Sequence, residues 1–101
     1  MVRLLDDAEI DRQLAELPDW NRVPEERAIT ATYELADFAT ALAFVNRVGD
    51  EAEQMNHHPD IDIRWNKVTL ALSTHSEGGL TQLDFELAHR VTSETGVGSE
   101  G

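Results

Sequence analysis

The 101-residue sequence contains no cysteine and a single lysine, Lys67, and both shortages narrow what the protein can be. Without cysteine the chain can form neither a disulfide framework nor a thiolate metal site. Eight basic residues against twenty acidic ones give a formal net charge of −12, which repels nucleic-acid phosphates and anionic membranes. We therefore expect neither nucleic acid nor a membrane as a partner.

Long hydrophobic runs are also missing from the sequence. No apolar run approaches the roughly 20 residues that span a bilayer, and no cationic segment followed by an apolar one opens the chain. This pattern predicts a cytoplasmic protein. Hydrophobic residues make up 41% and charged residues 28%, as in an ordinary globular domain. We expect one domain over residues 1–91, followed by a disordered polar C-terminal tail over residues 92–101.

Three segments carry apolar residues at helical spacing, each preceded by a residue that can cap a helix. The capping residues are Asp6, Asp37 and Thr81, and Pro18 ends the first segment. The longest predicted helix follows Asp37. Its apolar stripe is predicted to contain Phe38, Leu42, Val45, Val48, Ala52 and Met55.

Four other segments have the alternation of strands, at residues 20–23, 28–34, 61–65 and 68–73. Pro24-Glu25-Glu26 predicts a turn inside the first pair, and Asn66-Lys67 predicts a tight turn inside the second. The resulting order is α-β-β-α-β-β-α. Strands paired in hairpins favour an α+β fold, with a four-stranded antiparallel sheet and three helices packed on one of its faces.

Residues that can carry chemistry gather in the second half of the chain. Glu53 lies four positions before His57, so the two side chains can meet on one helical face. His58 precedes Pro59, which favours an extended backbone. The two adjacent imidazoles should therefore point in different directions, which suits contact with a ligand from two sides better than chelation of one metal ion. His75 follows at the tip of a predicted strand.

Each of these residues also has a purely structural interpretation. A Glu53–His57 pair could be a surface salt bridge worth about 0–1 kcal/mol. His75 could be an exposed turn residue, and Asp84 could simply complete the helix cap that Thr81 begins. A zinc site made by His57, His75 and Asp84 is a sharper alternative, although no familiar ligand spacing such as H-E-x-x-H is present.

Taken together, these residues resemble the signature of the pterin-4a-carbinolamine dehydratase family. The resemblance extends from about Trp20 to Val91 and rests on the order acid, His-His-Pro, aromatic, His, Asp. In this sequence the order reads Glu53, His57-His58-Pro59, Trp65, His75 and Asp84. The combination is specific, although Trp65 stands where tyrosine is frequent.

The resemblance implies removal of water from a 4a-hydroxytetrahydropterin to give the quinonoid dihydropterin, in tetrahydrobiopterin recycling. No metal and no organic cofactor is implied. The implied acid–base group is His57, His58 and His75, with the division between acid and base left open. The implied substrate-binding residues, among which Glu53 would orient His57 and Asp84 would orient His75, are Glu53, Pro59, Ser73, Thr74 and Asp84.

The resemblance also implies partners. The substrate is a small pterin, the protein is a homodimer or homotetramer, and an aromatic amino-acid hydroxylase can act in the same pathway. Because some relatives assist transcription factors by subunit association, the alternative function is that of a non-catalytic dimerisation partner.

Overall fold

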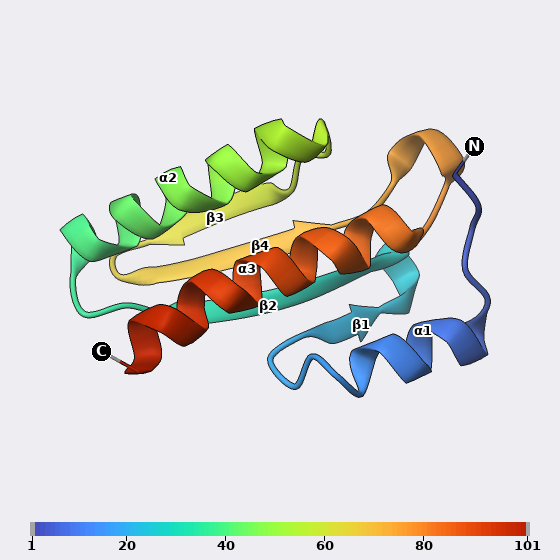
Figure 1. Cartoon of the computed structure of the whole chain (residues 1–101), viewed down its shortest axis with the longest axis horizontal. Coiled ribbons are helices and arrows are strands. Elements are labelled where there is room, and N and C mark those ends of the chain that lie inside the picture. Colours follow the sequence, from blue (N-terminus) through green and yellow to red (C-terminus); the bar gives the residue numbers. More distant parts are fainter. Residues whose placement is uncertain (1, 101) are drawn as a thin grey trace.

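The structure is a computed structural model that describes residues 2–100, with the side chains of residues 2–94. The predicted α-β-β-α-β-β-α order is confirmed, and Figure 1 shows α2 and α3 lying against one face of the sheet, with α1 near β1. No helix within residues 2–100 is long and apolar enough to cross a membrane. The elements are α1 (Asp7–Leu14), β1 (Asn21–Val23), η1 (Pro24–Glu26), β2 (Ala28–Glu34), α2 (Phe38–Met55), β3 (Asp60–Arg64), β4 (Lys67–Leu72), η2 (His75–Glu77) and α3 (Gln82–Glu100), where η denotes a short 3-10 helix.

The four strands form one antiparallel sheet in the order β1-β2-β4-β3. The two central strands, β2 and β4, pair with Ile29 opposite Leu72. Their alternating apolar residues all point to the helical face and are buried, as the period of two predicts. These residues are Ile29, Ala31, Tyr33, Val68, Leu70 and Leu72. The edge strand β3 is largely exposed.

The three predicted caps are confirmed. Asp6 and Glu9 form a reciprocal capping box, in which the Glu9 N–H donates to Asp6 Oδ1 at 2.8 Å. The Asp37 carboxylate accepts from Thr40 N at 2.7 Å, and hydrogen bonding to Thr40 lowers the pKa of Asp37. Thr81 precedes α3, and its hydroxyl accepts from Leu83 N at 3.3 Å. Each helix therefore begins where the sequence indicated.

The predicted apolar stripe of α2 was partly wrong. Phe38 and Leu42 are 45% and 40% exposed, whereas Ala41 and Phe44 are completely buried. Apolar residues occupy two neighbouring stripes of this helix, and periodicity alone does not say which one faces the sheet. Phe38 instead stacks on Trp65, with ring centroids 6.4 Å apart.

The turn between β3 and β4 also differs from the prediction. Because Arg64 pairs with Lys67, the two turn residues are Trp65 and Asn66 rather than Asn66 and Lys67. Trp65 has a φ of 57°, which two-residue hairpins often require at their first central position, and it is 70% exposed. The side chain of Asn66 holds the turn by donating to the Leu35 carbonyl at 2.8 Å.

Helix α3 continues past Thr92, where we expected the ordered domain to end. The indole N–H of Trp20 donates to Thr92 Oγ1 at 3.3 Å, and Arg47 Nε lies 3.2 Å from a carboxylate oxygen of Glu94. These contacts attach the part of α3 that directly follows Val91 to the rest of the domain. The predicted tail therefore cannot begin at Thr92. Position 101 of that tail lies outside the described residues.

Candidate active site

The connection between α2 and β3 places the two adjacent histidines. Asn56 adopts the left-handed conformation, with φ 52°, at the end of α2. Its N–H donates to the Glu53 carbonyl at 3.2 Å, and the N–H of His57 donates to the Ala52 carbonyl at 3.1 Å. This pair of bonds is the Schellman motif, which ends helices at a residue that tolerates positive φ, as asparagine does. The motif turns the chain at Asn56, so His57 no longer follows the surface of the helix.

His57 forms a buried pair with Asp84. Nε2 of His57 lies 2.6 Å from Oδ1 of Asp84, and the two residues are 9% and 0% exposed. Asp84 lies in the first turn of α3, where its other oxygen accepts from Thr81 N at 2.9 Å. A buried carboxylate is tolerated only when its lone pairs are matched by donors, and this one has donors from three residues, the third being Thr74.

The hydroxyls of Thr74 and Thr81 extend this network. Thr74 Oγ1 lies 2.8 Å from Asp84 Oδ2 and donates to it, because a carboxylate only accepts. The Thr81 hydroxyl, 2.8 Å from that of Thr74, must then be the donor to it. One consistent set of donors and acceptors thus fixes the Asp84 carboxylate, and it leaves Nδ1 of His57 as the ring nitrogen not bonded to Asp84. Since Thr74 is also buried, its hydroxyl acts within the protein.

Two side-chain pairings predicted from the sequence are wrong. Glu53 lies beside His58 rather than His57, with Oε2 and Nε2 2.6 Å apart on the surface. Asp84 bonds to His57 rather than orienting His75. The spacing rule for a helix applies only while the helix lasts, and the turn at Asn56 ends it before the first histidine.

His75 lies on η2, directly after Thr74, and is exposed. A small cavity of about 70 Å³ has Asp60, Ser73 and His75 among its lining residues. Asp60 pairs with Ala71, and continuing that antiparallel register places His58 level with Ser73. The His-His-Pro segment and the His75 turn therefore lie at the same end of the sheet, linked through Thr74 and Asp84.

The remaining predicted residues have less specific surroundings. Pro59 lies between His58 and the first residue of β3, and the Ser73 hydroxyl donates to the Arg27 carbonyl at 2.7 Å. Within the described residues no group of three or more histidine, aspartate or glutamate side chains is arranged to hold a metal ion. Among the described residues there is therefore no arrangement that matches the zinc site considered from the sequence.

Sequence reasoning did not assign a site role to Asn56 or Thr81. Asn56 turns His57 towards α3, and Thr81 orients the carboxylate that holds His57. The sequence signal for Asn56 is an asparagine that directly follows an apolar helical pattern. For Thr81 the signal was the capping pattern with Asp84, which also positions the site aspartate.

Comparison with known proteins shows which family this chain is similar to. The family model described as pterin 4 alpha carbinolamine dehydratase matches residues 3–93. A relative from Roseiflexus castenholzii is 53% identical over 91 residues, which cover 90% of this chain and 96% of the relative. One from Nocardia farcinica is 50% identical over 90 residues, which cover 89% and 93%. Both carry the provisional name pterin-4-alpha-carbinolamine dehydratase.

Two solved structures have a fold similar to that of this chain. A crystal structure of a transcriptional coactivator/pterin dehydratase from Brucella melitensis superposes with a TM-score of 0.86 at 34% identity, covering 90% of this chain and 97% of that one. A pterin dehydratase-like RuBisCO assembly factor of the alpha-carboxysome superposes with a TM-score of 0.63 at 18% identity, which shows a shared fold alone.

The family model and the named relatives define the class of protein as a hydro-lyase. The chain belongs to the pterin-4a-carbinolamine dehydratase family.

Proposed function

We propose that the protein removes water from 4a-hydroxytetrahydropterins, giving quinonoid dihydropterins, with His57, His58 and His75 as the acid–base group. The observation that carries this proposal is the buried His57–Asp84 pair, at 2.6 Å, in a chain of this family. A reaction that needs proton transfer near neutral pH suits imidazole, whose ordinary pKa is about 6.5. Tetrahydrobiopterin recycling after aromatic hydroxylation is the corresponding physiological setting.

The chemistry requires one proton to be given and one to be taken. Hydroxide is a poor leaving group, so an acid protonates the oxygen on C4a while the C4a–O bond breaks and water leaves. The N5 lone pair forms the C4a=N5 double bond, and a base removes the N5 proton. The enzyme ends with the number of protons that it had at the start. Positioned proton transfer of this kind contributes about 10²–10⁴-fold.

We assign Nδ1 of His57 to one of these transfers. Since Nε2 is bonded to Asp84, the other ring nitrogen is the one available to substrate. His58 and His75 supply the partner group, from the end of the sheet where their segments meet.

The other predicted residues support the site in different ways. Glu53 orients His58, and Asp84 and Thr74 act through His57. Pro59 fixes the segment that carries the histidine pair, and the region of Ser73 beside His75 contacts the pterin.

The partners expected from the sequence remain proposals. The open edge strands β1 and β3 and the exposed Phe38 and Leu42 are compatible with a homodimer or homotetramer. An aromatic amino-acid hydroxylase as pathway partner, a cytoplasmic location and the alternative role as a non-catalytic dimerisation partner stay predictions. The Brucella melitensis protein is described both as a transcriptional coactivator and as a pterin dehydratase, and a measurement of turnover separates these two roles.

The test is to supply a 4a-hydroxytetrahydropterin and to follow its dehydration by absorbance. We expect acceleration over buffer, a rate about 10²–10⁴-fold lower for His75→Gln, and an unchanged rate for His89→Gln. His89 is the matched control because it is exposed on α3, beside Glu16 at 3.8 Å. A folded wild-type protein that does not accelerate the reaction contradicts the proposal.

A further inference from the structure

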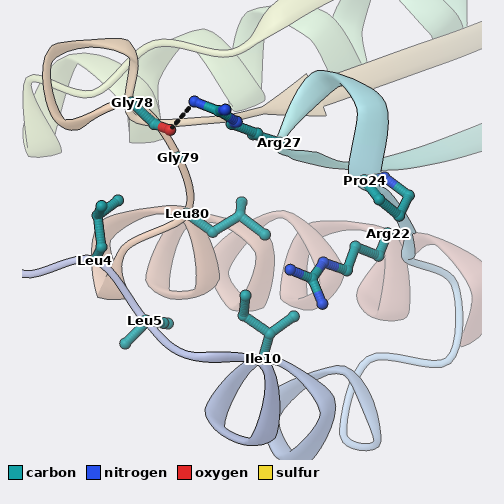
Figure 2. Close-up of a pocket in the computed structure, with 9 residues that line it drawn as sticks. All are labelled: Leu4, Leu5, Ile10, Arg22, Pro24, Arg27, Gly78, Gly79 and Leu80. Atoms are coloured by element: carbon teal, nitrogen blue, oxygen red, sulfur yellow. Dashed lines mark hydrogen bonds between the residues drawn. The ribbon is translucent and has the colours of Figure 1, made fainter.

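A second cavity lies on the other side of the turn that carries His75. It has a volume of about 290 Å³, is open to solvent on one side, and is lined by residues of the N-terminal segment, η1 and the loop after η2. Figure 2 shows its apolar side chains, Leu4, Leu5, Ile10 and Leu80, with Arg22 pointing between Ile10 and Leu80 and Arg27 extending towards the Gly78 carbonyl. None of the residues assigned above to catalysis or pterin binding lines this cavity.

The charge of the cavity is opposite to that of the whole chain. The sequence holds twenty acidic residues and seven arginines, yet the lining includes Arg22 and Arg27 and no acidic residue. Arg22 is paired with Asp7 at 2.9 Å, but the two guanidinium groups beside the apolar surface still outnumber this one carboxylate. Such a site favours a ligand that carries both a negative charge and an apolar body.

The Arg22 guanidinium has N–H groups that are not engaged in hydrogen bonds within residues 2–94. Its Nη2 lies 2.9 Å from an Asp7 oxygen, but its Nε is buried and has no hydrogen-bond partner among the described residues. In Figure 2 the Arg22 guanidinium points between Ile10 and Leu80. The side chain is 30% exposed, so the guanidinium N–H groups not bonded to Asp7, rather than the buried Nε, are the donors that an acceptor in the cavity can reach.

Arg27 supplies the second guanidinium. Its Nη1 donates to the carbonyl of Gly78 at 3.3 Å, drawn as the dashed line in Figure 2. This bond is long and its acceptor is neutral. A carboxylate is a stronger acceptor for a guanidinium and can take two parallel N–H bonds. Arg27 could therefore exchange the Gly78 carbonyl for an anionic ligand.

We propose that this cavity binds a small organic carboxylate with a compact apolar body. The apolar body would lie against Leu4, Ile10 and Leu80, and the carboxylate would accept from Arg22 and Arg27. The volume is at the lower end of the range for small-molecule sites, which limits the ligand to about one ring or a short branched chain.

Titration with benzoate tests the proposal, with benzyl alcohol as an uncharged probe of similar size. We expect saturable 1:1 binding, followed by backbone amide NMR, with shifts at Gly79 and Leu80. Benzyl alcohol should bind at least about tenfold more weakly, because charge-assisted hydrogen bonds to guanidinium are lost. Equal binding of the two probes, or benzoate shifts that do not saturate, contradicts the proposal.

Variants locate the site independently of enzymatic activity. Arg22→Gln and Arg27→Gln should each weaken benzoate binding at least about tenfold. Arg64→Gln removes an arginine paired with Asp62 on the exposed strand β3 and should change nothing. Asp7→Asn removes the carboxylate on Arg22 and should bind benzoate at least as tightly as wild type. If Arg22→Gln fails to fold, Arg27→Gln decides the question, and wild-type affinity in that variant overturns the proposal.

Discussion

Two neighbouring histidines in this protein make the same contact in opposite surroundings. His57 lies 2.6 Å from Asp84, and His58 lies 2.6 Å from Glu53. In the first pair the side chains are 10% and 0% exposed, and in the second they are 54% and 77% exposed. Distance alone would rank the two pairs as equal, whereas burial separates them.

The two pairs differ in energy because water can replace a lost partner only where the pair is exposed. When one partner of the exposed pair is removed, solvent takes over its hydrogen bond, so such pairs contribute about 0–1 kcal/mol. When one partner of a buried pair is removed, the other is left without a partner in a low-dielectric interior, at a cost of about 3–5 kcal/mol. We infer that the His57–Asp84 pair fixes the position of the site residues. The His58–Glu53 pair makes a smaller contribution to their position.

The largest expected effect is on turnover. Replacing His57 by glutamine removes the group assigned to proton transfer and should lower the dehydration rate about 10²–10⁴-fold. The measurement is the initial rate with a 4a-hydroxytetrahydropterin, using His89→Gln as the matched control. A His57→Gln protein with wild-type turnover would place the chemistry on another residue.

The next effect concerns stability. Asp84→Ala should lower the free energy of unfolding by about 3–5 kcal/mol, because His57, Thr74 and Thr81 lose a shared buried partner. Glu53→Ala should lower it by no more than about 1 kcal/mol. Urea unfolding of both variants and the wild type measures the difference. Equal losses would mean that burial does not distinguish the two pairs.

A smaller effect is expected within the exposed pair itself. A double-mutant cycle with His58→Ala and Glu53→Ala should give a coupling free energy of about 1 kcal/mol or less, decreasing as salt is added. The same denaturation experiment at low and high salt supplies the four free energies of the cycle at each ionic strength. Strong, salt-independent coupling would show that this pair is shielded from solvent in solution, for example by another subunit.

A last effect, read as a pKa, involves the surface pair of Arg3 and Glu9, which serves as a reference. The Arg3 guanidinium, together with the Asp6 N–H of the capping box, lowers the pKa of Glu9 from 4.5 to about 2. Because the folded value is depressed, the stabilisation is present above about pH 4.5 and is lost as the pH falls towards 2. Carboxyl NMR titration should show Glu9 among the last groups to protonate. An ordinary titration would mean that these bonds do not persist in solution.

Much of the fold could be predicted from local patterns. Strands β2 and β4 are the two central strands of the sheet, and the alternation of their residues was enough to predict both of them as strands. The capping residues Asp6, Asp37 and Thr81 were predicted because the chemistry of a helix start is local. The C-terminal extent of α3 was not predicted, because the hydrogen bond between Trp20 and Thr92 joins residues that are far apart in the sequence.

For the site, the sequence indicated which residues matter but not how they pair. Glu53 was assigned to the wrong histidine because a left-handed residue at Asn56 ends the helix before His57. Asp84 was assigned to His75, nine positions away, although the sheet brings His57 to it. Which ring nitrogen faces the substrate depends on that partner and cannot be deduced from spacing.

The most direct test of the central claim compares dehydration rates of wild type, Asp84→Asn and Glu53→Gln in one assay. Asp84→Asn can present an N–H where Nε2 of His57 needs an acceptor, so it disturbs the ring without changing the size of the residue. We predict a loss of at least about 100-fold for Asp84→Asn, and less than about tenfold for Glu53→Gln. Equal losses, or a larger loss for Glu53→Gln, would contradict the claim that the buried pair governs the chemistry.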